Sequence, residues 1–267
     1  MHVHLLDQYH RGESLVYRLD ARLKVLLTLG FIVVCSLTPA GRWRTFAALA
    51  LLWLISALTA RVPLPLLLRR SLVALPFTLA AATLLVTTPG VPLLRLPLAA
   101  LTITDAGLIA FLSLLLRSWL SLLMALLLSA TTTFPDLLVA LRALHVPKTL
   151  VAVVAFMLRY LFVLGDEALR LLRAREARSA ATAGQRSGGS MRWRARVAGG
   201  MVGSLFLRST GRSERIFQAM ASRGYQGELR TLTPPRLRPA DVFVGLLFLL
   251  CLVLAACLKF EVWSLKF

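Results

Sequence analysis

Long apolar runs decide what this chain can fold into. A helix needs about 20 residues to cross a bilayer core about 30 Å thick. Five runs approach or exceed that length: Leu23–Leu37, Thr45–Ala60, Leu72–Thr87, Ala106–Ala130 and Val242–Leu258. With 58% hydrophobic residues and a mean hydropathy of +0.75, the chain is also more apolar than a soluble domain. We therefore expect an all-α fold, a polytopic helical membrane protein with five to six apolar helices.

A sixth run, Thr149–Gly165, contains Arg159 and ends at Asp166 and Glu167. If it does not span and the N-terminus is inside, nine basic residues of the short connections are cytoplasmic and three are outside, as the positive-inside rule favours. The nine are Arg11, Arg18, Arg22, Lys24, Arg61, Arg69, Arg70, Arg142 and Lys148, and the three are Arg42, Arg44 and Arg95. If the run spans and residues 166–238 are still cytoplasmic, the N-terminus is outside. Three of these basic residues are then cytoplasmic and nine are outside.

Arg159 supports the same topology, because a charge at mid-bilayer costs at least about 2.5–3.5 kcal/mol on insertion scales. We expect residues 149–165 to form a buried or tilted helix that leads into the cytoplasm without crossing fully. The expected domains are residues 1–165, N-terminal transmembrane helices; 166–238, a cytoplasmic segment; and 239–267, a C-terminal transmembrane helix. The protein is expected in the cell (inner) membrane, with its N-terminus cytoplasmic and no cleaved signal peptide.

The net charge of +19 also has a membrane explanation. Its arginines lie between apolar runs, a pattern that anionic lipid and the positive-inside rule explain better than nucleic-acid binding does. Cys35, Cys251 and Cys257 lie in apolar runs and form no CxxC pair, so neither a disulfide framework nor a zinc site is indicated.

Local sequence signals predict where several helices begin and where one loop lies. Asp20 can cap the first apolar helix, and Thr104 or Asp105 the fourth. Pro135 suits the first turn of a short helix over residues 136–144. The proline-containing stretch at residues 87–98 is expected to be an extended loop on the outside.

The basic segment is expected to be folded. Between Arg170 and Arg238 it carries fifteen arginines and three acidic residues, yet keeps apolar residues at helical spacing. One helix is expected to end near Arg178, a second to cover Met191–Leu207, and another to end at Gly224.

Two of these helix ends carry an arginine between small residues, at Ala177-Arg178-Ser179 and Ser222-Arg223-Gly224. A guanidinium with five donors can pair with carboxylates or helix-terminal carbonyls in a partner's groove, and small neighbours let that partner approach. The structural alternative is that arginine favours helix C-termini through the macrodipole and that Gly224 only ends the helix.

Three stretches resemble one family of membrane proteins. They are residues 7–24, which include DQY, GES and YRLDARLK; residues 156–167, with FMLRY and DE; and residues 214–225, with ER and AMASRGY. On these the chain resembles the transmembrane (T) component of energy-coupling-factor (ECF) transporters, and within them the CbiQ-like cobalt transport permeases.

The resemblance implies that Arg178 and Arg223 insert into grooves on two ABC-type ATPase subunits. The departures from the family's Ala-Arg-Gly pattern, Ser179 and Ser222, keep the neighbours small. The segment 166–238 then contains coupling helices, and the transmembrane part binds a CbiM-like, substrate-binding S component for uptake of cobalt or nickel, linked to cobalamin biosynthesis. No cofactor is expected in this chain, since ATP and Mg²⁺ belong to the ATPases. Arg159, Asp166, Glu167 and Glu214 are candidates for structural or coupling support.

Other functions are considered as alternatives: a T component for another micronutrient, a permease that binds substrate itself, and a membrane-embedded enzyme. An enzyme would need paired acids, histidine clusters or a nucleophile with a base, and the apolar runs carry almost no ionisable groups. Arg117 and Arg159 are the exceptions, and we expect them to pair structurally. His2 and His4 suit nickel or cobalt as ligands but lack a third ligand nearby, so no metal site is predicted.

Overall fold

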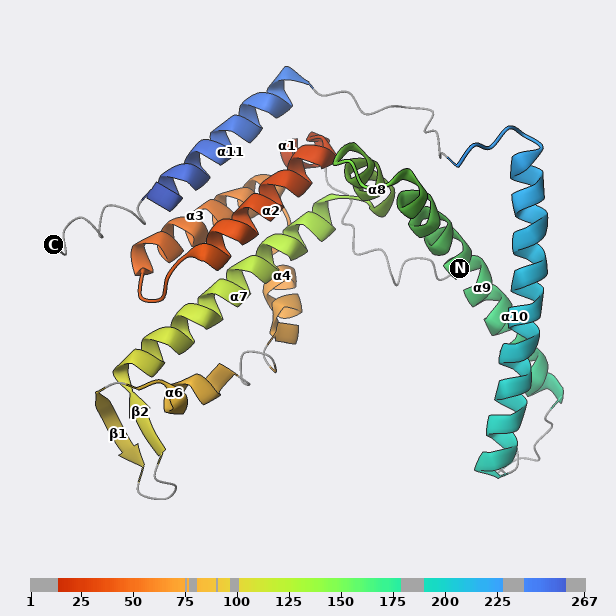
Figure 1. The fold of residues 1–267 in the computed structure, drawn as a ribbon, viewed down its shortest axis with the longest axis horizontal. Helices are drawn as coiled ribbons and strands as arrows, with labels where there is room; N and C mark the ends of the chain where they lie inside the picture. Colours follow the sequence, from red (N-terminus) through yellow and green to blue (C-terminus); the bar gives the residue numbers. More distant parts are fainter. Residues whose placement is uncertain are drawn as a thin grey trace. The chain divides into compact units, whose positions relative to one another are not determined.

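The computed structural model describes residues 14–74, 76, 81–89, 91–96, 101–178, 190–227 and 238–257. Helices make up most of this part of the chain, as Figure 1 shows. The chain divides into two compact units, the first formed by residues 1–144 and 233–267 and the second by residues 145–232. The expected helical architecture is confirmed for most of the described residues.

Four long helices form the body of the first unit: α2 (Ala21–Leu37), α3 (Trp43–Ala60), α7 (Asp105–Thr131) and α11 (Pro239–Cys257). They correspond to the first, second, fourth and fifth expected apolar runs. Shorter pieces are α1 (Leu15–Arg18), α4 (Leu64–Ser71), α6 (Leu84–Thr87) and α8 (Phe134–Ala143), with 3-10 turns at Leu72–Ala74 and Ala81–Thr83.

Side-chain caps begin three of these helices where the sequence indicated. Asp20 accepts a hydrogen bond from the Arg22 backbone N–H at 2.9 Å, at the start of α2. Thr104 accepts from the Gly107 N–H at 3.2 Å, so the cap of α7 is Thr104 rather than Asp105. Thr133 caps α8 in the same way, and Pro135 lies in its first turn. These caps satisfy backbone donors that have no partner inside the helix.

Helices α3, α7 and α11 are long and apolar enough to cross a membrane. Helix α2 has 17 residues, at the lower end of the roughly 17–25 that a span requires. Large apolar side chains are exposed along these helices, including Val33 on α2, Leu58 on α3 and Phe243 on α11. An apolar exterior of this kind suits a helix whose solvent is lipid.

Two sequence expectations about the region between α4 and α7 are wrong. The run Leu72–Thr87 does not form one helix, because its described part consists of 3-10 turns and the short α6. Pro76 lies inside this run, and proline both lacks an N–H and clashes with the preceding helical turn.

The second correction concerns the stretch expected to be an extended loop, while the fold class remains all-α. Strands β1 (Pro92–Leu96) and β2 (Leu101–Thr104) pair antiparallel within the region expected to be an extended loop and just after it. Pro92 is the first residue of its strand, a position where a missing N–H is tolerated.

Helix α7 is the centre of the first unit. It packs against α2, α3, α4 and α6. The core around it includes Phe31, Leu49, Leu67 and Leu127, each at most 4% exposed. Its Trp119 indole also donates a hydrogen bond to the Ser71 hydroxyl of α4 at 2.8 Å.

Two cations join the antiparallel helices α2 and α7, one near each end of α2. The Lys24 ammonium of α2 donates to the Thr131 carbonyl at the C-terminus of α7, at 3.1 Å. The Arg117 guanidinium of α7 donates to the Thr38 carbonyl, just past the C-terminus of α2, at 2.6 Å. Each cation thus bonds to terminal carbonyls that have no partner within their own helix and carry partial negative charge. The pairing expected for Arg117 is confirmed.

The second unit contains two long helices, α9 (Lys148–Arg178) and α10 (Met191–Ala221). The helix expected over Met191–Leu207 and the one expected before Gly224 are a single helix of 31 residues. They were predicted as separate because residues 208–215 are nearly all polar and show no apolar periodicity. Apart from Ala152, every side chain of this unit whose burial is described is at least partly exposed.

Helix α9 continues through residues 165 and 166 without a break. It is long and apolar enough to cross a membrane. Within its most apolar stretch of 18 residues, 6% of the residues are buried inside the chain. It is therefore not a helix buried in this chain. The partial crossing expected from the charge count, and the domain limits at residues 165 and 238, remain predictions.

Replacing Lys24 with methionine is expected to destabilise the first unit. The Thr131 carbonyl then loses a charged donor in an apolar setting, at a cost of about 1.5–3 kcal/mol. Thermal unfolding in detergent measures this as a lower Tm. The matched control is Arg69→Met, at an exposed cation on α4, for which a shift near zero is expected. Equal Tm shifts for both variants contradict a stabilising role for the Lys24–Thr131 hydrogen bond.

Candidate functional site

The first candidate coupling arginine is Arg178, in the last described turn of α9. Its side chain and that of Ala177 are exposed, and Ser179 lies outside the described residues. Arg175 and Arg178 both lie in this last turn, where positive charge is favoured by the negative end of the helix macrodipole. The position therefore presents a guanidinium on a helical support.

The second candidate coupling arginine, Arg223, lies in a well-defined turn after α10. The Tyr225 N–H donates to the Met220 carbonyl and the Gly224 N–H to the Ala221 carbonyl, both at 3.0 Å. Gly224 has φ of 79°, the left-handed conformation that glycine adopts most easily. These two bonds form a Schellman motif, which leaves Arg223 exposed on a turn whose backbone is fixed.

The two candidate coupling arginines are not brought together. Helices α9 and α10 run antiparallel, since Phe156 contacts Tyr225 near one end and Arg178 lines the same cleft as Trp193 near the other. Arg178 and Arg223 therefore lie near opposite ends of α10. At 1.5 Å per residue from Trp193 to Arg223, the separation is about 45 Å.

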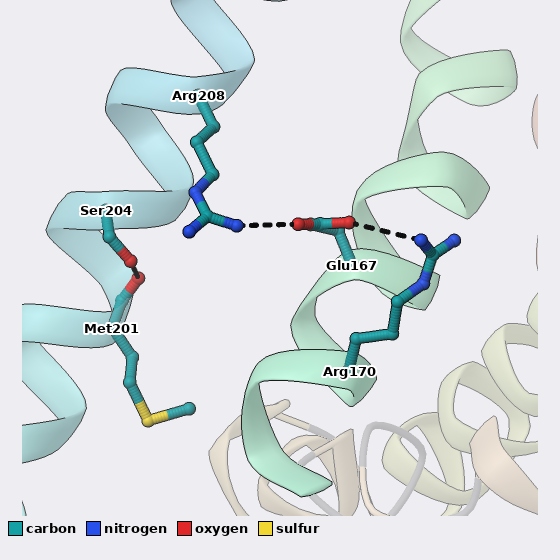
Figure 2. A network of polar contacts seen from close by, with 5 residues as sticks. All are labelled: Glu167, Arg170, Met201, Ser204 and Arg208. Carbon is teal, nitrogen blue, oxygen red and sulfur yellow. Dashed lines mark hydrogen bonds and ion pairs between the residues drawn. The ribbon is translucent and has the colours of Figure 1, made fainter. Parts of the chain in front are cut away.

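The four candidate supporting residues differ in their surroundings. Glu167 binds Arg208 of α10 at 3.0 Å and lies 3.7 Å from Arg170, one turn along α9 (Figure 2). Arg159, Asp166 and Glu214 are exposed. Among the described residues Arg159 makes no ion pair, so the structural pairing expected for it is not found there. Glu167 is the one of the four that joins the two helices.

Sequence reasoning missed Arg208. It is one of fifteen arginines in the basic segment and belongs to none of the motifs examined. Its role depends on α9 and α10 pairing with Glu167 opposite it, over a separation of 41 residues. No sequence signal at position 208 distinguishes it from the exposed arginines nearby.

The described part of the chain contains no group of three or more His, Cys, Asp or Glu side chains that could hold a metal ion. His2 and His4, the residues considered as nickel or cobalt ligands, lie outside it.

Comparison with known proteins identifies the family. The model of the CbiQ family, described as cobalt transport protein, matches residues 12–234, so the chain belongs to this family. The energy-coupling factor transporter transmembrane protein EcfT of Listeria innocua is 30% identical over 237 residues, 84% of this chain and 85% of its own. The cobalt transport protein CbiQ of Rhodobacter capsulatus is 28% identical over 217 residues, 81% and 82% of the two chains.

The nickel permease LarQ of Lactiplantibacillus plantarum is 34% identical over 97 residues, 36% of this chain and 33% of its own. The resemblance drawn from the three sequence stretches is thus confirmed over most of the chain. The protein is a multi-pass transmembrane T component of an ECF transporter and not an enzyme.

The turn that presents Arg223 generates a local prediction. Gly224→Ala places a Cβ in the left-handed conformation, at a cost of roughly 1–2 kcal/mol. Amide exchange at positions 224 and 225 is then expected to rise about five- to thirty-fold. The control is Gly203→Ala, in the interior of α10 with open space around it. It should slow amide exchange in the turn around position 203, because alanine favours helix. A Schellman turn is contradicted if both substitutions slow exchange.

Proposed function

We propose that this chain couples ATP hydrolysis to uptake of a metal ion. Two ABC-type ATPase subunits bind at Arg178 and Arg223, and helices α9 and α10 transmit their movement to the transmembrane helices, which bind the S component. The observation that carries this proposal is the placement of two exposed arginines at helix ends about 45 Å apart on one hairpin. Two separate subunits can each hold one such end.

The surface of the hairpin supports a role in binding partners. On α10, Val202, Phe206, Leu207 and Phe217 are each 60–73% exposed. Large apolar side chains gathered on one helix are typical of an interaction surface. Since the hairpin buries almost nothing of its own, we infer that partner subunits cover it in the assembled transporter.

Cobalt is the cargo that we propose, with nickel as the nearest alternative. The family's description and the names of two relatives support this, one a cobalt transport protein and one a nickel permease. The proposed partner in the membrane is a CbiM-like S component, which selects the ion, and the physiological context is cobalamin biosynthesis. A T component for another micronutrient is the second candidate, because EcfT relatives carry no metal in their names.

ATP and Mg²⁺ are bound by the ATPase subunits in this proposal, and the chain itself carries no cofactor. We further propose that the N-terminus and residues 166–238 face the cytoplasm, where the ATPases are. The excess of basic residues in the connections on that side supports this orientation.

Removing the coupling arginines is expected to separate the chain from its ATPases. Arg178→Ala and Arg223→Ala should each weaken co-purification by about ten-fold or more, because a hydrogen bond to a charged group contributes about 1.5–3 kcal/mol. The double variant should lose the ATPases. Quantitative pull-down of the detergent-solubilised complex measures this, and ATP-dependent Co²⁺ uptake in proteoliposomes should fall in parallel.

The control for these variants is Arg173→Ala, which removes another exposed guanidinium from α9 before its last turn. It should bind ATPases as wild type does. A double Arg178/Arg223 variant that assembles and takes up metal at the wild-type rate excludes the proposed coupling role.

Sidedness has its own test. With Cys35, Cys251 and Cys257 replaced by alanine, a single cysteine introduced at the exposed Arg192 should react with a membrane-impermeant maleimide in inverted vesicles but not in intact cells. A cysteine at the exposed Arg44, expected outside, serves as the opposite control. Labelling of position 192 from outside overturns the topology.

A further inference from the structure

Glu167 is the point where an ion pair joins the two helices of the second unit. Its Oε1 accepts from the Arg208 guanidinium of α10 at 3.0 Å, while its Oε2 lies 3.7 Å from that of Arg170 on its own helix (Figure 2). The Glu167 side chain is 16% exposed, whereas those of Arg208 and Arg170 are 62% and 72% exposed. The carboxylate thus lies within the helix contact, and the guanidinium groups reach it from the outside.

This contact is important because no hydrophobic core holds α9 and α10 together. Ala152 is the one buried side chain among the residues of this unit whose burial is described. Besides the ion pair, an edge-to-face contact joins Phe156 to Tyr225 with ring centroids 6.1 Å apart. Without a close-packed core, the angle between the helices depends on such individual contacts.

The space between the helices is uneven about the ion pair. Toward the Arg223 end, the Phe156–Tyr225 contact closes the hairpin, and a pocket of about 250 Å³ lined by Tyr160 and Ile216 lies beside it. Toward the Arg178 end, a cleft of about 680 Å³ separates the helices. Ala174, Arg178, Trp193 and Met201 are among the residues that line it. The space between the helices is therefore wider toward the Arg178 end than toward the Arg223 end.

We propose that the Glu167–Arg208 ion pair is the pivot of this hairpin, about which the Arg178 end opens and closes across the cleft. The two residues act as positioning residues, because they set where Arg178 lies relative to Arg223. This role rests on the coupling function proposed above. An exposed ion pair suits a pivot. It keeps the two helices in contact at one point, yet its stabilising free energy is small enough that the helices can rotate about that point.

The first test measures the cleft directly, in the full-length chain in lipid nanodiscs. After the three native cysteines are replaced by alanine, spin labels are attached at cysteines introduced for Ala174 and Met201, on opposite walls. Glu167→Gln and Arg208→Gln should each broaden the label-to-label distance distribution, lowering the fraction at the wild-type distance about two- to five-fold, as loss of an exposed ion pair predicts.

Two further variants make this test specific. Glu167→Arg together with Arg208→Glu restores opposite charges across the helices and should recover the narrow distribution. Arg170→Gln removes the guanidinium that approaches the same carboxylate from within α9, so it should leave the distances unchanged. Failure of the charge exchange to restore the distribution, or an equal effect of Arg170→Gln, overturns the pivot.

The second test uses the complex with the ATPases. Glu167→Gln should leave assembly intact but abolish the change in cleft distance on ATP binding, and the charge exchange should restore that change. If the wild-type chain does not assemble with the ATPases, the proposed function is contradicted. If the Glu167→Gln complex assembles and shows the wild-type change in cleft distance, only the pivot is contradicted.

Discussion

Cations within an apolar helical bundle need hydrogen-bond acceptors, and in the first unit the C-terminal carbonyls of α2 and α7 provide them. Lys24 binds the end of α7 and Arg117 binds beyond the end of α2. Both contacts use acceptors that the helix itself leaves unpaired, so charge and backbone are satisfied together. The contacts lie near opposite ends of α2 and hold it against α7, and α3, α4 and α6 also pack against α7.

The second unit is stabilised in the opposite way. Among its described residues almost no side chain is buried, and the contacts that join its helices include the Glu167–Arg208 ion pair and the Phe156–Tyr225 aromatic contact. Its candidate coupling arginines, Arg178 and Arg223, lie exposed at helix ends, with Arg223 on a turn fixed by two backbone hydrogen bonds. A unit of this kind is suited to transmitting movement, because its helices are individually regular and its angles depend on few contacts.

Local signals predicted well wherever the cause was local. The caps at Asp20 and Thr104 and the glycine turn at Gly224 depend on residues within a few positions of each other, and the sequence shows them. Prediction failed where an apolar run, Leu72–Thr87, is not one continuous helix, and where a polar stretch, residues 208–215, continued a helix. The run Leu72–Thr87 is apolar throughout, so its composition does not show where the helix ends. Residues 208–215 interrupt the apolar pattern, so their composition does not show that the helix continues.

The sequence by itself determined the membrane class, most of the apolar helices, the family and the positions of Arg178 and Arg223, because hydropathy, short motifs and helix-end chemistry are written in neighbouring residues. Only the tertiary structure decided that Arg117 binds Thr38, that Arg178 and Arg223 lie near opposite ends of a hairpin, and that Arg208 is the partner of Glu167. The physical reason is that these contacts join residues 41 to 79 positions apart, and a side chain carries no local record of what folding places opposite it.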